Sequence, residues 1–107
     1  MYSFSEFLKK IREESDLRQE DLARILGVST ILVSMIETGQ KDVSKKFIKV
    51  LADKMGVSPI SITPFLILEK ETTFKHISHT EKTFIRLAEK LQIHLIQMKA
   101  KNLKRYV

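Results

Sequence analysis

The stretch from residue 19 to residue 39 constrains the fold most, because helix-forming runs alternate there with residues that end helices. Small or apolar residues recur at helical spacing in its first part, at Leu22, Ala23, Ile25 and Leu26. Gly27 follows, and glycine enters a left-handed C-cap without steric cost. Ser29 can then accept a hydrogen bond from the first turn of a second helix, in which Val33 and Ile36 face inward. The stretch therefore predicts two short helices joined by a tight turn.

Two helices in this order are the layout of a helix-turn-helix, whose second helix lies in the DNA major groove. The flanking sequence predicts further helices. One spans about residues 5–14, and Ser44 caps another over residues 45–55, which Gly56 ends. Pro59 begins a short fifth helix, at a position where a missing N–H costs nothing. With two prolines and three glycines in 107 residues, the expected fold class is all-α.

Charge and cysteine content narrow the class of protein. Residues 1–66 hold ten Lys and Arg against nine Asp and Glu, whereas residues 67–107 hold nine against four, so the excess of +6 lies mostly in the C-terminal part. Cysteine is absent, which excludes disulfides and thiolate metal sites and fits a cytoplasmic protein. No apolar run approaches the ~20 residues that a membrane helix needs. No nucleophile, base and orienting group occur together, so we expect no enzyme, no metal and no cofactor.

A long helix is predicted at the C-terminal end. Ser78 and Glu81 match a capping box, and the chain continues to about Leu103 without glycine or proline. Its stripe is too apolar for solvent and predicts a dimer or partner interface at Phe84, Leu87, Leu91, Leu95 and Met98. The sequence therefore suggests two units: residues 1–66, expected to fold alone, and residues 67–107, a linker and a helix for association.

Residues 4–66 resemble the Cro/C1-type (XRE) family of helix-turn-helix proteins. The resemblance rests on the segment LKKIREESDLRQEDLARILGVSTILVSMIETGQK and on LADKMGVS further along. It implies a five-helix, lambda-repressor-like domain that binds double-stranded DNA through its third helix. It also implies a buried ion pair between Arg12 and Glu37, which would join the first helix to the end of the third.

The resemblance further implies which side chains meet DNA. Gln19 matches a phosphate contact, and Ile31, Ser34 and Met35 match positions that project into the major groove. Arg18 departs from the family's usual Ser or Thr cap and is a second phosphate candidate. Leu32 is left open between packing and readout, since an apolar side chain reads only thymine methyls or fills space. The predicted DNA-binding set is Arg18, Gln19, Ser29, Thr30, Ile31, Ser34, Met35, Thr38, Lys41 and Lys45.

Two functions follow as expectations. The first is a sequence-specific transcriptional repressor that acts as a homodimer on a palindromic operator, because one small domain makes too few base contacts for useful specificity. The alternative is an antitoxin, similar to the HipB or HigA type, that neutralises a toxin protein and represses its own operon. The long C-terminal helix would serve the dimer in the first case and the toxin in the second.

Overall fold

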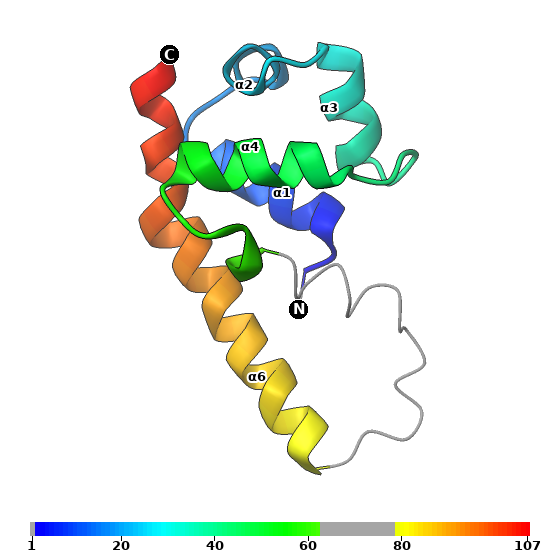
Figure 1. Cartoon of the computed structure of the whole chain (residues 1–107), viewed down its shortest axis with the longest axis vertical. Helices are drawn as coiled ribbons and strands as arrows, with labels where there is room; N and C mark the ends of the chain where they lie inside the picture. The colour runs from blue at the N-terminus through cyan, green and yellow to red at the C-terminus, as the bar shows by residue number, and fades with distance from the viewer. Residues whose placement is uncertain (1, 63–78) are drawn as a thin grey trace.

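The computed structural model describes residues 2–62 and 79–107, and all regular structure within these ranges is helical (Figure 1). The first four helices are α1 (Phe4–Glu14), α2 (Gln19–Leu26), α3 (Thr30–Glu37) and α4 (Lys45–Met55). A short turn, η1 (Pro59–Ser61), follows α4, so the expected fifth helix is only one turn of 3₁₀ helix in the described residues. The C-terminal part comprises α6 (His79–His94), η3 (Leu95–Lys99) and η4 (Ala100–Tyr106). The predicted all-α fold class is confirmed.

Serine caps and glycine stops define the helix ends. The hydroxyl groups of Ser3, Ser29 and Ser44 accept hydrogen bonds from the N–H of Glu6, Leu32 and Phe47, which starts α1, α3 and α4. Gly27 and Gly56 end α2 and α4 with φ of 70° and 73°, in the left-handed region that glycine enters without strain. The helix boundaries predicted for this part of the chain therefore follow from local chemistry.

One hydrophobic core joins the N-terminal helices to the C-terminal segment. Phe7, Leu8 and Leu51 are fully buried at its centre. The same cluster of buried residues contains Leu95 and Leu103, and Ala100 lies between these two in the chain. The division into residues 1–66 and residues 67–107 stays a prediction, and the two parts share this core. Leu95 of the predicted stripe is buried because η3 packs against α1 and η4 packs against α1 and α4, whereas Leu87 and Met98 are exposed.

Hydrogen bonds also join the C-terminal segment to the N-terminal helices. The Ser15 hydroxyl lies 2.7 Å from the carbonyl oxygens of Ile11 and of Ala100, and its single hydrogen can serve one at a time. Asn102 donates from Nδ2 to the carbonyl of Met55, the last residue of α4, at 2.6 Å. The Gln92 amide pairs with both the N–H and the carbonyl of Tyr2, at 3.0 and 2.9 Å. The C-terminal segment is thus fastened to both ends of α1 and to the end of α4.

The change of helical winding at residue 95 explains how this segment stays on the core. Residues Leu95–Lys99 form a π-helical turn, which rotates less per residue than an α-helix, and η4 is a 3₁₀ helix, in which residues three apart eclipse. Ala100 and Leu103 are consequently both buried, and Tyr106 lies under the ammonium of Lys54 on α4, 4.2 Å from the ring centre. The regular α-helix predicted to residue 103 therefore ends at His94, and the segment continues with different winding.

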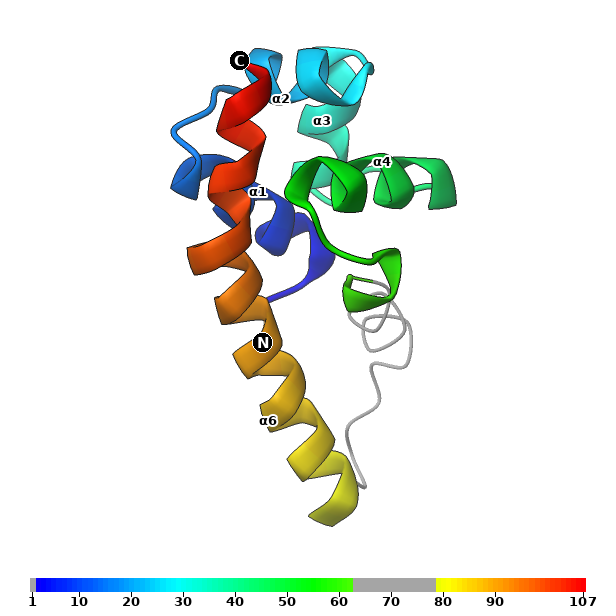
Figure 2. The ribbon, with the colours of Figure 1, turned by 60° about the vertical axis from the view of Figure 1, so that its left-hand side comes forward.

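The other end of α6 extends away from the helical body in both ribbon views (Figures 1 and 2). The capping box predicted for Ser78 and Glu81 lies outside what the structure describes, because residue 78 and the side chain of residue 81 are not included. The extended part exposes apolar surface, as at Leu87. This part of α6 therefore lies largely outside the core of the chain.

Candidate nucleic-acid interface

The turn between α2 and α3 presents the outer face of α3. After the left-handed Gly27, the N–H of Val28 bonds back to the carbonyl of Ala23 at 2.9 Å and closes the corner. Only Val33 and Ile36 of α3 are buried, and Ile31 is 72% exposed. The face of α3 that carries Ile31 is therefore open to solvent.

The residues of α3 that are predicted to contact DNA bases differ in their exposure to solvent. Thr30 and Ile31 are exposed at the start of α3, whereas Ser34 and Met35 are half-buried one turn later. Leu32 is half-buried and packs against the core, which favours its packing role over readout. The accessible edge of α3 therefore combines hydroxyl groups with apolar side chains.

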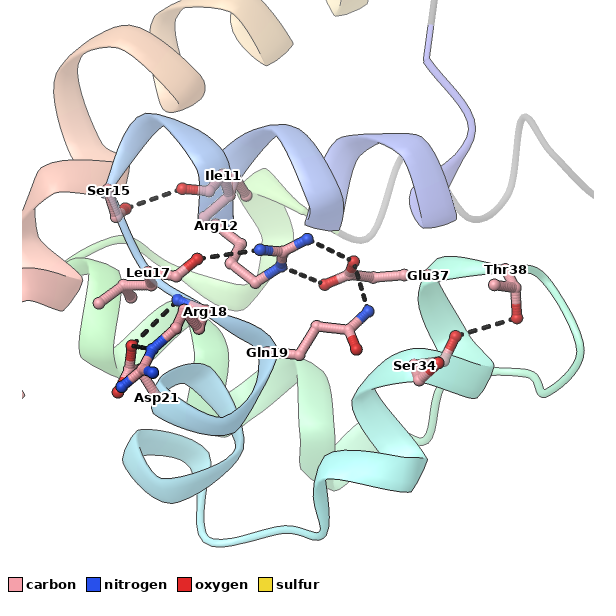
Figure 3. Close-up of polar contacts among 10 residues, drawn as sticks. All are labelled: Ile11, Arg12, Ser15, Leu17, Arg18, Gln19, Asp21, Ser34, Glu37 and Thr38. Atoms are coloured by element: carbon pink, nitrogen blue, oxygen red, sulfur yellow. Dashed lines mark hydrogen bonds and ion pairs between the residues drawn. The ribbon is translucent and has the colours of Figure 1, made fainter.

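Two hydroxyl groups that are predicted to contact DNA form hydrogen bonds within the chain. The Ser29 hydroxyl accepts from the N–H of Leu32 as the cap of α3. The Thr38 hydroxyl is exposed and donates to the carbonyl of Ser34 at 2.9 Å (Figure 3). Each oxygen retains hydrogen-bonding capacity toward DNA, since a hydroxyl offers one donor and two acceptor sites. Their places in the DNA-binding set stay predictions.

Arg12 and Glu37, predicted as an ion pair, lie against each other (Figure 3). The guanidinium donates from Nε to Oε2 of Glu37 at 2.8 Å and from Nη2 to Oε1 at 3.1 Å. Its remaining nitrogen, Nη1, donates to the carbonyl of Leu17 at 2.9 Å. The side chains of Arg12 and Glu37 are 15% and 2% exposed. The pair therefore joins α1, the end of α3 and the loop before α2.

Gln19 belongs to the same network, which the sequence reading did not anticipate. Its Nε2 donates to Oε1 of Glu37 at 3.2 Å, so the first residue of α2 contacts the last residue of α3 (Figure 3). The sequence indicates a role for Gln19 and a role for Glu37, but it holds no signal that joins two residues 18 positions apart. Gln19 is half-buried, which leaves part of its amide open to solvent.

Arg18 precedes α2 and is held by acidic neighbours. Its guanidinium lies 2.9 Å from Glu20 and 3.5 Å from Asp21, and the side chain is 77% exposed. A guanidinium has no acceptor, so Arg18 cannot cap α2 with its side chain. Asp21 instead accepts from the Arg18 backbone N–H at 3.0 Å, and this bond, followed by the attraction of the Arg18 charge and a bond from Arg24, lowers the pKa of Asp21.

The cations predicted beyond α3 are accessible. Gly39, at φ 77°, turns the chain, and the carbonyl of Met35 accepts from the N–H of Gln40 and of Lys41 at 2.8 and 3.2 Å. The side chains of Lys41 and Lys45 are exposed on either side of the turn into α4. Exposed cations thus follow the C-terminal end of α3, and Arg18 directly precedes α2.

The residues predicted to form a dimer or partner interface differ in their exposure to solvent. Leu87 and Met98 are 59% and 63% exposed, and Leu91 is half-buried against the core. The prediction is wrong for Leu95, which is 2% exposed, because the chain's own core already covers it. The side chain of Phe84 lies outside what the structure describes.

An exposed face on the second helix of a tightly joined pair, with accessible cations before the first helix and after the second, is the arrangement of a helix-turn-helix. The helix-turn-helix family model matches residues 8–62, slightly more than half of the chain, and the chain belongs to this family. It is therefore a DNA-binding transcription regulator. Members of this class are typically not enzymes, and no catalytic family is indicated.

A curated relative is the antitoxin PezA of Streptococcus pneumoniae, which is 36% identical over 55 residues. The matched region is 51% of this chain but only 35% of that protein, so the chain spans about a third of the relative's length. No solved structure matches the chain. Among the helices that the structure describes, none is long and apolar enough to cross a membrane.

Proposed function

We propose that the protein is a sequence-specific transcriptional repressor that binds a palindromic operator as a homodimer. The observation that carries the proposal is the open face of α3, fixed against α2 and α1 by the buried contacts around Glu37. A rigid recognition helix loses little conformational freedom when it enters the major groove, which favours affinity.

Phosphate contacts would set the register of this docking. Arg18 and Gln19 lie at the start of α2, and Lys41 and Lys45 lie beyond the end of α3. Contacts on both sides of a recognition helix hold it at one angle in the groove but carry no sequence information. Thr30 and Ser34 would then bond base edges, and Ile31 and Met35 would contact thymine methyl groups.

The exposed part of α6 supports the dimer. Leu87, Leu91 and His94 follow one another at intervals of four and three residues, which is the spacing of a coiled-coil seam, and Met98 is exposed on the π-helical turn that follows α6. Leu87 and Met98 lack a covering surface within the described chain. A second copy packed along this seam would place two recognition helices on half-sites about one DNA turn apart.

Selection of binding sites from a random duplex library tests the proposal. We expect an inverted repeat, bound by two chains per duplex in sedimentation. Ser34→Ala should change the preferred base at one symmetric pair of positions, with a cost of ~1–3 kcal/mol at the original site. Lys49→Ala, an exposed change on α4, serves as the control. Recovery of a single asymmetric site bound by one chain would contradict the dimer.

The similarity to the antitoxin PezA favours a second candidate function. In this alternative the chain neutralises a toxin protein and represses its own operon, and the exposed seam of α6 binds the toxin. A stoichiometric complex with the product of an adjacent gene, and relief of that product's toxicity on co-expression, would support it. In that event Leu87→Asp should abolish the complex while leaving the melting temperature near the wild-type value.

A further inference from the structure

The contact between Gln19 and Glu37 gives Glu37 a function beyond its ion pair. We infer that Glu37 is a positioning residue for DNA binding, which orients the amide of Gln19 so that it donates to a phosphate oxygen. The inference rests on the proposed function, in which Gln19 contacts the DNA backbone. It concerns how the free protein prepares that contact.

The carboxylate of Glu37 is itself immobile. Arg12 occupies both of its oxygens, at 2.8 and 3.1 Å, and donates its remaining nitrogen to the carbonyl of Leu17. The Glu37 side chain is 2% exposed, so the carboxylate cannot turn into bulk water without leaving these contacts. Oε1 therefore offers Gln19 an acceptor at a fixed point (Figure 3).

A carboxylate acceptor decides which end of the Gln19 amide faces inward. An ionised carboxylate only accepts, so the amide must turn Nε2 toward Glu37. That nitrogen carries two hydrogens, and the bond to Oε1 uses one. The second hydrogen remains for an acceptor outside the protein, and the planar amide fixes its direction. A phosphate oxygen is an acceptor of this kind, and helix N-termini supply further donors beside it.

The charge of Glu37 does not repel the phosphate, because the guanidinium of Arg12 lies directly against it. The pair has no net charge, and both carboxylate oxygens accept hydrogen bonds, Oε2 from Arg12 and Oε1 from Arg12 and Gln19 (Figure 3). A glutamine without this partner would have to lose its side-chain freedom on binding, at a cost in affinity. Here that freedom is already restricted in the free protein.

A double-mutant cycle tests the inference, with a short duplex of mixed sequence as the probe, since a phosphate contact is independent of base sequence. The variants are Gln19→Ala, Glu37→Gln and the two together. Glu37→Gln replaces one acceptor oxygen by a donor, so that Gln19 and Arg12 can no longer both be satisfied. We expect Gln19→Ala to weaken binding roughly tenfold, as for hydrogen bonds to charged groups.

Glu37→Gln should weaken binding by about threefold or more in the wild-type background and by less than about twofold when residue 19 is alanine. Equal weakening in both backgrounds would mean that Glu37 acts on DNA binding only through the fold, and would overturn the inference. Glu14→Gln, which removes an exposed charge from α1, is the matched control and should have the same effect in both backgrounds.

Thermal melts accompany every variant. If Glu37→Gln does not fold, Glu37→Asp takes its place, since it keeps the charge beside Arg12 but draws the carboxylate back from Gln19. Wild-type affinity in Gln19→Ala would overturn the inference while leaving DNA binding by the chain intact. Failure of the wild-type chain to bind any duplex would overturn the proposed function and the inference with it.

Discussion

Arg12 uses all three of its guanidinium nitrogens inside the protein, two on Glu37 and one on Leu17. Truncating either partner of this pair leaves a charge in a nearly closed site. We therefore expect Arg12→Ala and Glu37→Ala each to lower the free energy of unfolding by about 3–5 kcal/mol, measured in denaturant. Arg18→Ala, at a side chain 77% exposed, should change it by less than about 1 kcal/mol. Equal losses at residues 12 and 18 would contradict the buried character of the pair.

Asp21 makes the start of α2 sensitive to acid. The N–H of Arg18 and the neighbouring guanidinium groups hold the pKa of Asp21 below its ordinary value. A group whose pKa is lower in the folded state stabilises the fold above its unfolded pKa, and this contribution disappears as the pH falls through the folded pKa. The wild-type chain should thus be more stable than Asp21→Asn at neutral pH, and the difference should shrink in acid melts. A constant difference down to acid pH would argue against the effect.

The salt dependence of DNA binding tests whether Lys41 contacts a phosphate. If its ammonium neutralises one phosphate, Lys41→Ala should flatten the slope of log affinity against log salt concentration by about 0.9. The loss of affinity should be uniform across DNA sequences, because a phosphate contact reads no base. Lys82→Ala, on the extended part of α6, should leave the slope unchanged. An unaltered slope for Lys41→Ala would place this lysine outside the interface.

At the scale of elements, the sequence predicted the helices with local signals and missed contacts between distant residues. The serine caps and the glycine stops lie within a few residues of the ends they define, so α1 to α4 were readable. The winding change at Leu95–Lys99 has no local signature, because it follows from packing against α1. For the same reason the sequence identified Gln19 and Glu37 separately but did not join them across 18 residues.

Two leucines on the C-terminal helical segment separate its internal and external faces. Leu95→Ala should lower the free energy of unfolding by about 2–5 kcal/mol, because it leaves a cavity in the core. Leu87→Ala, at an exposed position, should change it by no more than about 0.5 kcal/mol if the chain is a monomer. If the dimer forms along α6, Leu87→Ala should instead lower the sedimentation coefficient at low concentration. Equal effects of both changes on the melt of the monomer would contradict the assignment of the faces.

At the scale of the whole molecule, the helix-turn-helix and the C-terminal segment share one hydrophobic core. A chain that ends before α6 loses Leu95, Ala100 and Leu103 from the core, together with the partners of Ser15 and Met55. We expect it to show no cooperative melt, or one shifted to far lower temperature. This prediction differs from the expectation, drawn from the sequence, that residues 1–66 fold alone. A truncated chain with a wild-type melt would restore that expectation.

The shared core also limits how this recognition helix can be transplanted. A chimera that carries only residues 8–62, the segment matched by the family, would contain α3 and its turn. It would lack the apolar side chains of the C-terminal segment that pack against α1 and α4. Swapping the specificity of two such regulators therefore requires either the outer residues of α3 alone, grafted onto an intact host, or the entire chain.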